Sequence, residues 1–154
     1  MMSRLKAMFG ALLLLIIIIQ FIRPARNNSG QAPIADISKQ FNVAVEVQRI
    51  LKASCYDCHS NNTYYPWYTN IQPIGWLLAN HIREGKAELN FNEFGNYSRR
   101  RQLSKLKAIG NSIRDGSMPL SSYTSVHADA RLSKETKAII IEWVTSVRDN
   151  LEKK

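Results

Sequence analysis

The chain has 154 residues, enough for one domain with a modest core, and a formal net charge of +9 from 21 basic and 12 acidic residues. The first 35 residues carry four of the basic side chains and no acid, and the remainder is only mildly basic. This distribution lacks the dense basic stripe of a nucleic-acid-binding protein, so no nucleic acid is expected as a partner.

Residues 7–22 form an almost entirely apolar run that follows two basic residues. Such a run predicts either a membrane helix or a secretory signal. Because no small-residue cleavage site lies close to Arg23, we expect residues 1–23 to be an uncleaved N-terminal membrane helix. The expected location is the cytoplasmic membrane, with the rest of the chain on its periplasmic side. Cleavage of the segment and secretion to the periplasm is the alternative.

Residues 24–36 are rich in Pro, Gly, Asn, Ser and Ala and are interpreted as a flexible tether. In the globular domain expected over residues 37–154, apolar side chains recur at helical spacing. The four expected helices span about 42–54, 73–85, 98–116 and 134–151. The expected boundary signals are Asn42 and Ser133 as N-caps and Gly85 and Gly116 as stops. Two long loops separate the helices, which predicts a ligand that the loops enclose.

The two cysteines of the chain, Cys55 and Cys58, are followed directly by His59, which gives the pattern C-x-x-C-H. This pattern is the attachment signature of a c-type haem. The two thiols lie at a fixed distance on one side of the backbone, so they can add to the two vinyl groups at one edge of a porphyrin. The next residue then sits under the iron, where its imidazole becomes an axial ligand. Covalent haem c is therefore the expected cofactor.

Three other interpretations of these cysteines are weaker. A structural zinc site needs four ligands, and only His81 and His127 remain, both far from the motif in the sequence. A thioredoxin-like dithiol needs a βαβ context, whereas this chain is expected to be helical. A disulfide across two residues would be strained and would leave His59 without a role.

The iron of such a haem has a sixth position, for which Met118 is the first candidate. Met118 lies in the loop before the last expected helix, and Pro119 stiffens that loop. A thioether ligand raises the reduction potential and suits electron transfer. Core packing would be the ordinary role of a methionine. His81 is the main rival as a ligand, because it shares a helical stripe with apolar residues, and His127 is the third candidate.

Side chains near the motif have expected roles around the porphyrin. The aromatic residues expected to wall it, or to fill the core with it, are Tyr64, Tyr65, Trp67, Tyr68 and Trp76. Arg83 and Lys86 are candidates for pairing with the haem propionates. The densest basic segment, residues 98–107, is interpreted first as a solvated helix face. An acidic redox partner or anionic lipid is the functional alternative.

The stretches around the two candidate ligands, residues 50–91 and 114–133, resemble the bacterial haem-binding domain family, a cytochrome-c-like group with one CxxCH motif. The resemblance covers about residues 40–150. It implies an all-α, cytochrome-c-like domain of about four helices wrapped around one covalent haem. By this resemblance, the cofactor-binding residues are Cys55, Cys58, His59 and Met118, and His59 and Met118 are the iron ligands.

The expected function is that of a membrane-anchored, monohaem c-type cytochrome that transfers electrons outside the cytoplasmic membrane to redox partner proteins. A haem-based sensor or small-ligand-binding module with a labile sixth ligand is the alternative. An enzyme such as a peroxidase is the weakest hypothesis, because no acid–base constellation accompanies the motif. No small-molecule substrate is therefore expected.

Overall fold

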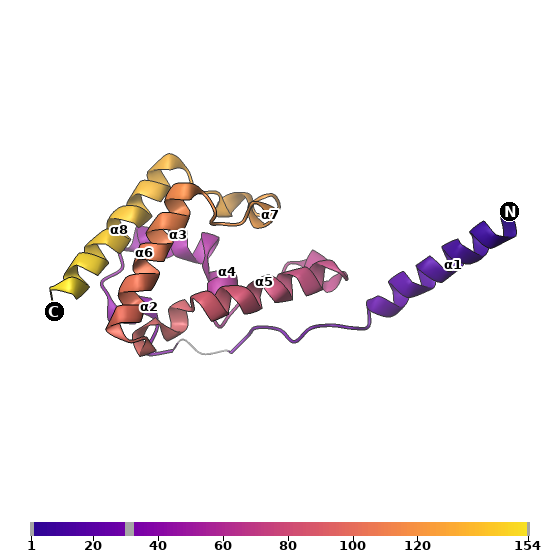
Figure 1. Cartoon of the computed structure of the whole chain (residues 1–154), viewed down its shortest axis with the longest axis horizontal. Helices are drawn as coiled ribbons and strands as arrows, with labels where there is room; N and C mark the ends of the chain where they lie inside the picture. Colours follow the sequence, from indigo (N-terminus) through magenta and orange to yellow (C-terminus); the bar gives the residue numbers. More distant parts are fainter. Residues whose placement is uncertain (1, 30–32, 154) are drawn as a thin grey trace.

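The computed structural model describes residues 2–29 and 33–153, and these residues form helices and no strand (Figure 1). The α-helices are α1 (Met2–Ile19), α2 (Ile37–Gln40), α3 (Val45–Ser54), α4 (Tyr56–His59), α5 (Ile74–Glu88), α6 (Arg99–Asp115), α7 (Ser121–Thr124) and α8 (Lys134–Glu152). The 3₁₀ helices are η1 (Trp67–Asn70), η2 (Phe91–Asn96) and η3 (Ala128–Ala130). The described residues are all helical, as expected, but the expectation of about four helices in the domain is wrong, because residues 37–153 form seven α-helices, three of them with only four residues.

The long helices of the domain, α3, α5, α6 and α8, lie where the apolar periodicity predicts them. Ser133 accepts a hydrogen bond from the Thr136 N–H and caps α8, and Gly116, with φ at 76°, ends α6. The N-cap expected at Asn42 is wrong, because α3 begins at Val45. Phe41, whose backbone is extended, and Val43 pack against the core, and residues 41–44 lie outside the helix.

The expected N-terminal membrane helix is wrong. Within the part of the chain that the structure describes, no helix is both long and apolar enough to cross a membrane. The apolar run is divided, because α1 ends at Ile19 and the chain then turns at residues 20–21. Helix α1 also includes Arg4 and Lys6, so its apolar part is shorter than the roughly 20 residues that a span needs. The location deduced from a single-pass anchor is wrong for the same reason.

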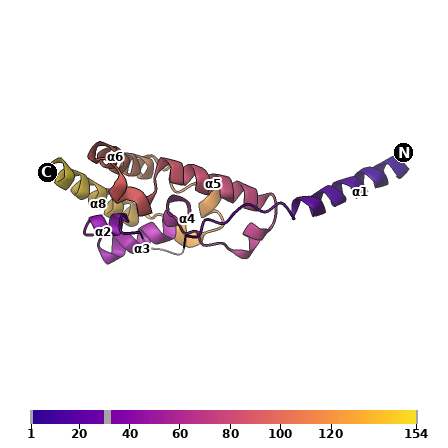
Figure 2. The same ribbon diagram turned by 90° about the horizontal axis from the view of Figure 1, so that it is seen from below.

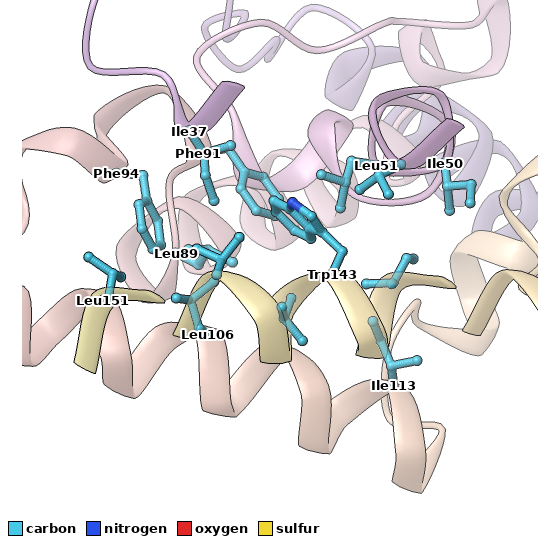
Figure 3. Packing of buried hydrophobic residues seen from close by; sticks show 14 residues of the cluster. Ile37, Ile50, Leu51, Leu89, Phe91, Phe94, Leu106, Ile113, Trp143 and Leu151 are labelled. Carbon is cyan, nitrogen blue, oxygen red and sulfur yellow. The ribbon is translucent and has the colours of Figure 1, made fainter. Parts of the chain in front are cut away.

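The hydrophobic core lies mainly between α8, α6, α3 and η2. Helices α6 and α8 pack side by side, and the Arg99 guanidinium donates hydrogen bonds of 2.6 to 2.9 Å to the Leu151 and Glu152 carbonyls at the end of α8. The Trp143 ring points from α8 toward Phe91 and Leu51 (Figure 3). Full burial of a Leu, Ile or Phe side chain in such a core stabilises the fold by about 1.5–3 kcal/mol. This core supports α3, which leads directly into the cysteine motif, and α6, which leads into the loop that carries Met118.

The segment after α1 runs along the loop that follows α4 (Figure 2). Two backbone hydrogen bonds join it there, from Ser29 N to Asn61 O at 3.1 Å and from Thr63 N to Asn27 O at 3.0 Å. The Asn27 side chain adds bonds to Ser60 O and Thr63 Oγ1. Part of the segment expected to be a tether is thus paired with the loop beside the cysteine motif.

Candidate functional site

The cysteine motif lies at the junction of α3 and α4. Cys55 ends α3 and precedes α4, and the N–H groups of Cys58 and His59 donate to its carbonyl at 3.3 and 3.0 Å. Both cysteines are free thiols. One helical turn therefore presents two sulfur atoms and an imidazole from neighbouring positions.

Two backbone carbonyls orient the His59 ring. Its Nδ1 atom lies 2.9 Å from the Gly85 carbonyl oxygen and 3.0 Å from the Leu89 carbonyl oxygen. Because a carbonyl oxygen only accepts, Nδ1 carries the proton and donates to both. In the neutral ring Nε2 is then unprotonated, which is the form in which an imidazole binds a metal. Phe91 packs edge-on against the ring, with 6.3 Å between the centroids.

Gly85 allows α5 to approach the motif closely. A Cβ atom at this position would lie 2.7 Å from the Cys58 carbonyl oxygen and 3.2 Å from the Cys58 Cβ. Gly85 does not end α5 as expected from the sequence, because the helix continues to Glu88. Its role is to bring a backbone carbonyl within hydrogen-bonding distance of His59.

A cavity of about 470 Å³ opens over the motif. Its walls are α5 and the Met118 segment, by which we mean residues 116–127, and α4 forms its base. The apolar residues that line it include Ile74, Leu77, Leu78, Leu120 and Val126, and the acids that line it are Asp57, Glu84 and Glu88. Its size and its largely apolar lining are those of a small-molecule or cofactor site.

All the sequence-predicted ligands line this one cavity. Cys55, Cys58 and His59 lie at its base, and Met118 lines it from the facing segment. Met118 also lines an adjoining cavity of about 220 Å³, together with Cys55 and His59. The rival ligands His81 and His127 line the main cavity as well, from α5 and from the Met118 segment respectively.

A family model described as the haem-binding domain matches residues 14–146. The chain belongs to the haem-binding domain family. The match covers most of the chain, and it confirms the family and haem as the bound group, whereas covalent attachment through Cys55 and Cys58 stays a prediction. No match was found among curated proteins or among solved structures.

The residues of this haem-binding domain fit a haem. The two free thiols stand at the base of an apolar cavity, and the imidazole beside them has its proton fixed on the nitrogen that faces α5. A side chain at Gly85 would push α5 away from Cys58. The donors available for a haem iron are one imidazole nitrogen, one thioether and two further histidines, a set that haem proteins use.

Burial changes the acidity of both thiols. It raises the pKa of Cys55 to about 12, with a smaller contribution from nearby Cys58. Burial and the adjacent Asp57 raise the pKa of Cys58 to about 11. Both thiols are therefore protonated at neutral pH, unlike the low-pKa thiol of a redox dithiol. Across residues 2–29 and 33–153, no three His, Cys, Asp or Glu side chains are placed to hold a metal ion.

Sequence reasoning missed a set of polar contacts around the cavity. The Tyr123 hydroxyl donates to Asp57 Oδ2 at 2.7 Å, and the Tyr68 hydroxyl donates to His127 Nε2 at 2.8 Å. These partners are 66 and 59 residues apart in the chain, so no local pattern signals them. The sequence held one weak signal of the contact to Tyr123, because Asp57 is an acidic residue inside the C-x-x-C pattern and could be expected to bind a hydrogen-bond donor.

Several other expected neighbours of the haem face elsewhere. Lys86 donates to Asn27 Oδ1 at 2.6 Å, and Arg83 donates to Asn80 beside it on α5. Among the aromatic residues, Tyr68 lines the cavity, whereas Tyr64 and Trp67 are more than 70 % exposed.

Proposed function

We propose that this haem-binding domain holds one c-type haem through thioether bonds to Cys55 and Cys58, and that it transfers electrons. The observation that carries the proposal is the shared cavity. Two free thiols, an imidazole with an unprotonated Nε2 and the Met118 thioether line the same space. When bound, the haem supplies the one-electron iron couple.

The thiols support covalent attachment. Each would add its sulfur to one carbon of a vinyl group and its hydrogen to the other, so the addition needs no external oxidant or reductant. Cys55 and Cys58 are separated by one helical turn, which matches attachment along one porphyrin edge.

The orientation of His59 favours Met118 as the opposite ligand. The Nδ1–H donates to the carbonyls of Gly85 and Leu89 at the end of α5, and Nε2, on the other side of Cε1 in the ring, points away from them. His59 would hold the haem iron through Nε2, and the second ligand would come from the part of the cavity lining that Nε2 faces. Met118 belongs to the wall facing α5, whereas His81 belongs to α5 itself.

His127 also belongs to the Met118 segment, but its ring nitrogens are less available than the Met118 sulfur to bind an iron. Its Nδ1 lies 3.1 Å from the Tyr123 carbonyl oxygen and must donate to it, so Nε2 is the acceptor of the Tyr68 hydroxyl. Both nitrogens already have partners within the protein. We therefore propose His59 and Met118 as the axial ligands, a pair that raises the reduction potential and leaves no open position for a substrate.

An acidic redox protein is the partner we propose. The net charge of +9 favours attraction to an acidic surface, and Arg100 and Lys107 are exposed on α6. Other cations of this helix have partners within the chain: Arg99 binds the end of α8, and Lys105 pairs with Glu88 at 3.2 Å. The exposed cations would increase the rate of encounter more than the affinity.

Carbon monoxide binding to the ferrous protein tests the proposed ligands. The wild type should bind carbon monoxide slowly, because Met118 fills the sixth position, and Met118→Ala should bind it rapidly. His81→Ala is the matched control, because His81 lines the same cavity from the opposite wall, and it should behave as the wild type. Rapid binding by the wild type would indicate a sensor with a labile ligand. Rapid binding by His81→Ala alone would contradict the Met118 assignment.

A further inference from the structure

Little apolar burial holds the Met118 segment in place. Not one of residues 116–127 is buried, and Met118 itself is 38 % exposed. A backbone hydrogen bond of 3.2 Å from the Met118 N–H to the Ser112 carbonyl ties the start of the segment to α6. Its later part contains only the short helix α7. Polar side-chain contacts must therefore contribute much of what fixes this wall of the cavity.

The strongest of these contacts reaches the cysteine motif. The Tyr123 hydroxyl donates to Asp57 Oδ2 at 2.7 Å. The other carboxylate oxygen of Asp57 accepts from the Tyr64 N–H at 3.0 Å, and the Asp57 carbonyl accepts from Thr63 Oγ1 at 2.6 Å. Asp57 is thus held by its own loop and offers a fixed, charged acceptor to Tyr123.

A second contact orients Tyr123. The ring of His127 stacks on the ring of Tyr123, with 4.0 Å between the centroids and 21° between the planes. His127 also donates to the Tyr123 carbonyl and accepts from the Tyr68 hydroxyl. Tyr123 is therefore fixed on two sides, with its hydroxyl directed at the motif.

We propose that Tyr123 is a positioning residue for the sixth haem ligand, acting through its hydrogen bond to Asp57. This bond ties the segment that carries Met118 to the motif that carries the haem. The role of Tyr123 rests on the proposed function, because it requires Met118 at the iron. A thioether is a weak ligand, so its occupancy depends on how well the protein holds it near the iron. Without the bond, the Met118 segment moves away more often and the sixth position opens.

The test is Tyr123→Phe in the full chain loaded with haem, compared with Tyr97→Phe. The control removes a half-buried tyrosine hydroxyl that accepts from the Asn90 N–H, outside the cavity. A hydrogen bond to a charged group contributes enough that its loss should speed carbon monoxide binding roughly ten- to hundredfold. The visible absorption band of sulfur-ligated ferric haem should weaken in parallel. Tyr97→Phe should match the wild type in both measurements, whereas equal rates in Tyr123→Phe and wild type would overturn the proposal.

Asp57→Asn and hydrogen exchange keep the proposal testable if Tyr123→Phe does not fold. An amide can accept from Tyr123 but lacks the charge, so Asp57→Asn should give a smaller increase in the carbon monoxide rate. Amides of residues 118–127 should exchange faster in either variant, with those of α5 unchanged. Unchanged exchange would overturn the proposal.

The two proposals fail in different ways. A wild type without thioether-bound haem, or an unchanged carbon monoxide rate in Met118→Ala, overturns the proposed function and the role of Tyr123 together. A faster rate in Met118→Ala with no change in Tyr123→Phe overturns the role of Tyr123 alone.

Discussion

Helix α5 and the Met118 segment face each other across one cavity, but different interactions hold them. On α5, Ile82 is 4 % exposed, Gly85 packs directly on the Cys58 backbone, and main-chain carbonyls bind His59. The Met118 segment has no buried residue and depends on side-chain hydrogen bonds such as that of Tyr123. The comparison indicates that backbone packing fixes the wall formed by α5 and the His59 ring beside it, whereas a few side-chain hydrogen bonds hold the opposite wall.

The largest expected difference between the two walls is in stability. Ile82→Ala removes a fully buried side chain from α5 and should lower the free energy of unfolding by about 2–5 kcal/mol. Val126→Ala is the matched truncation on the Met118 segment, where the side chain is 62 % exposed, and should change it by about 0.5 kcal/mol or less. Urea unfolding of both variants measures this. Equal losses would contradict the contrast between the walls.

The thiols at the base of the cavity should respond to pH as buried groups. Burial raises the pKa of Cys58 to about 11, so its thiolate fraction at pH 8 should be roughly a hundredfold lower than that of an exposed cysteine. Alkylation of the chain produced without haem should therefore be slow at pH 8 and should accelerate about tenfold per pH unit up to about pH 11. A plateau near pH 9 would show that the thiols are open to water.

The close approach of α5 to the motif gives the third prediction. Gly85→Ala places a Cβ 2.7 Å from the Cys58 carbonyl oxygen, so α5 must shift, at a cost of about 1–3 kcal/mol. Gly10→Ala in α1 is the control, because a Cβ there meets nothing within 4 Å. Chemical denaturation should separate the two variants, with only Gly85→Ala destabilised. If both behave alike, the tight packing of α5 on the motif is wrong.

The helices of the domain were largely predictable from the sequence because their signals are local. Apolar periodicity located the long helices, and Ser133 and Gly116 marked boundaries through capping and a left-handed turn. Gly85 misled the prediction, since a glycine that stops a helix and one that permits close packing look the same in a sequence. The apolar N-terminal run misled it as well, because its composition did not show that α1 would end at Ile19.

The candidate site was predictable only in part. The spacing of Cys55, Cys58 and His59 carries its own chemical meaning, so the base of the cavity could be named in advance. The bond between Tyr123 and Asp57 joins residues far apart in the chain and follows from the packing of the Met118 segment, which no periodic pattern encodes. The sequence could therefore name the candidate ligands, which the structure places around one cavity, but not the contacts that hold the cavity walls.

Covalent attachment is the central claim, and the intact mass of the denatured, reduced chain tests it most directly. After production with a haem lyase, the wild type should carry the added mass of one haem and keep its colour through acid–acetone extraction. Cys55→Ser/Cys58→Ser should have the mass of the polypeptide alone, since a serine hydroxyl does not form the thioether. A wild-type chain that releases all its haem on denaturation would contradict the account.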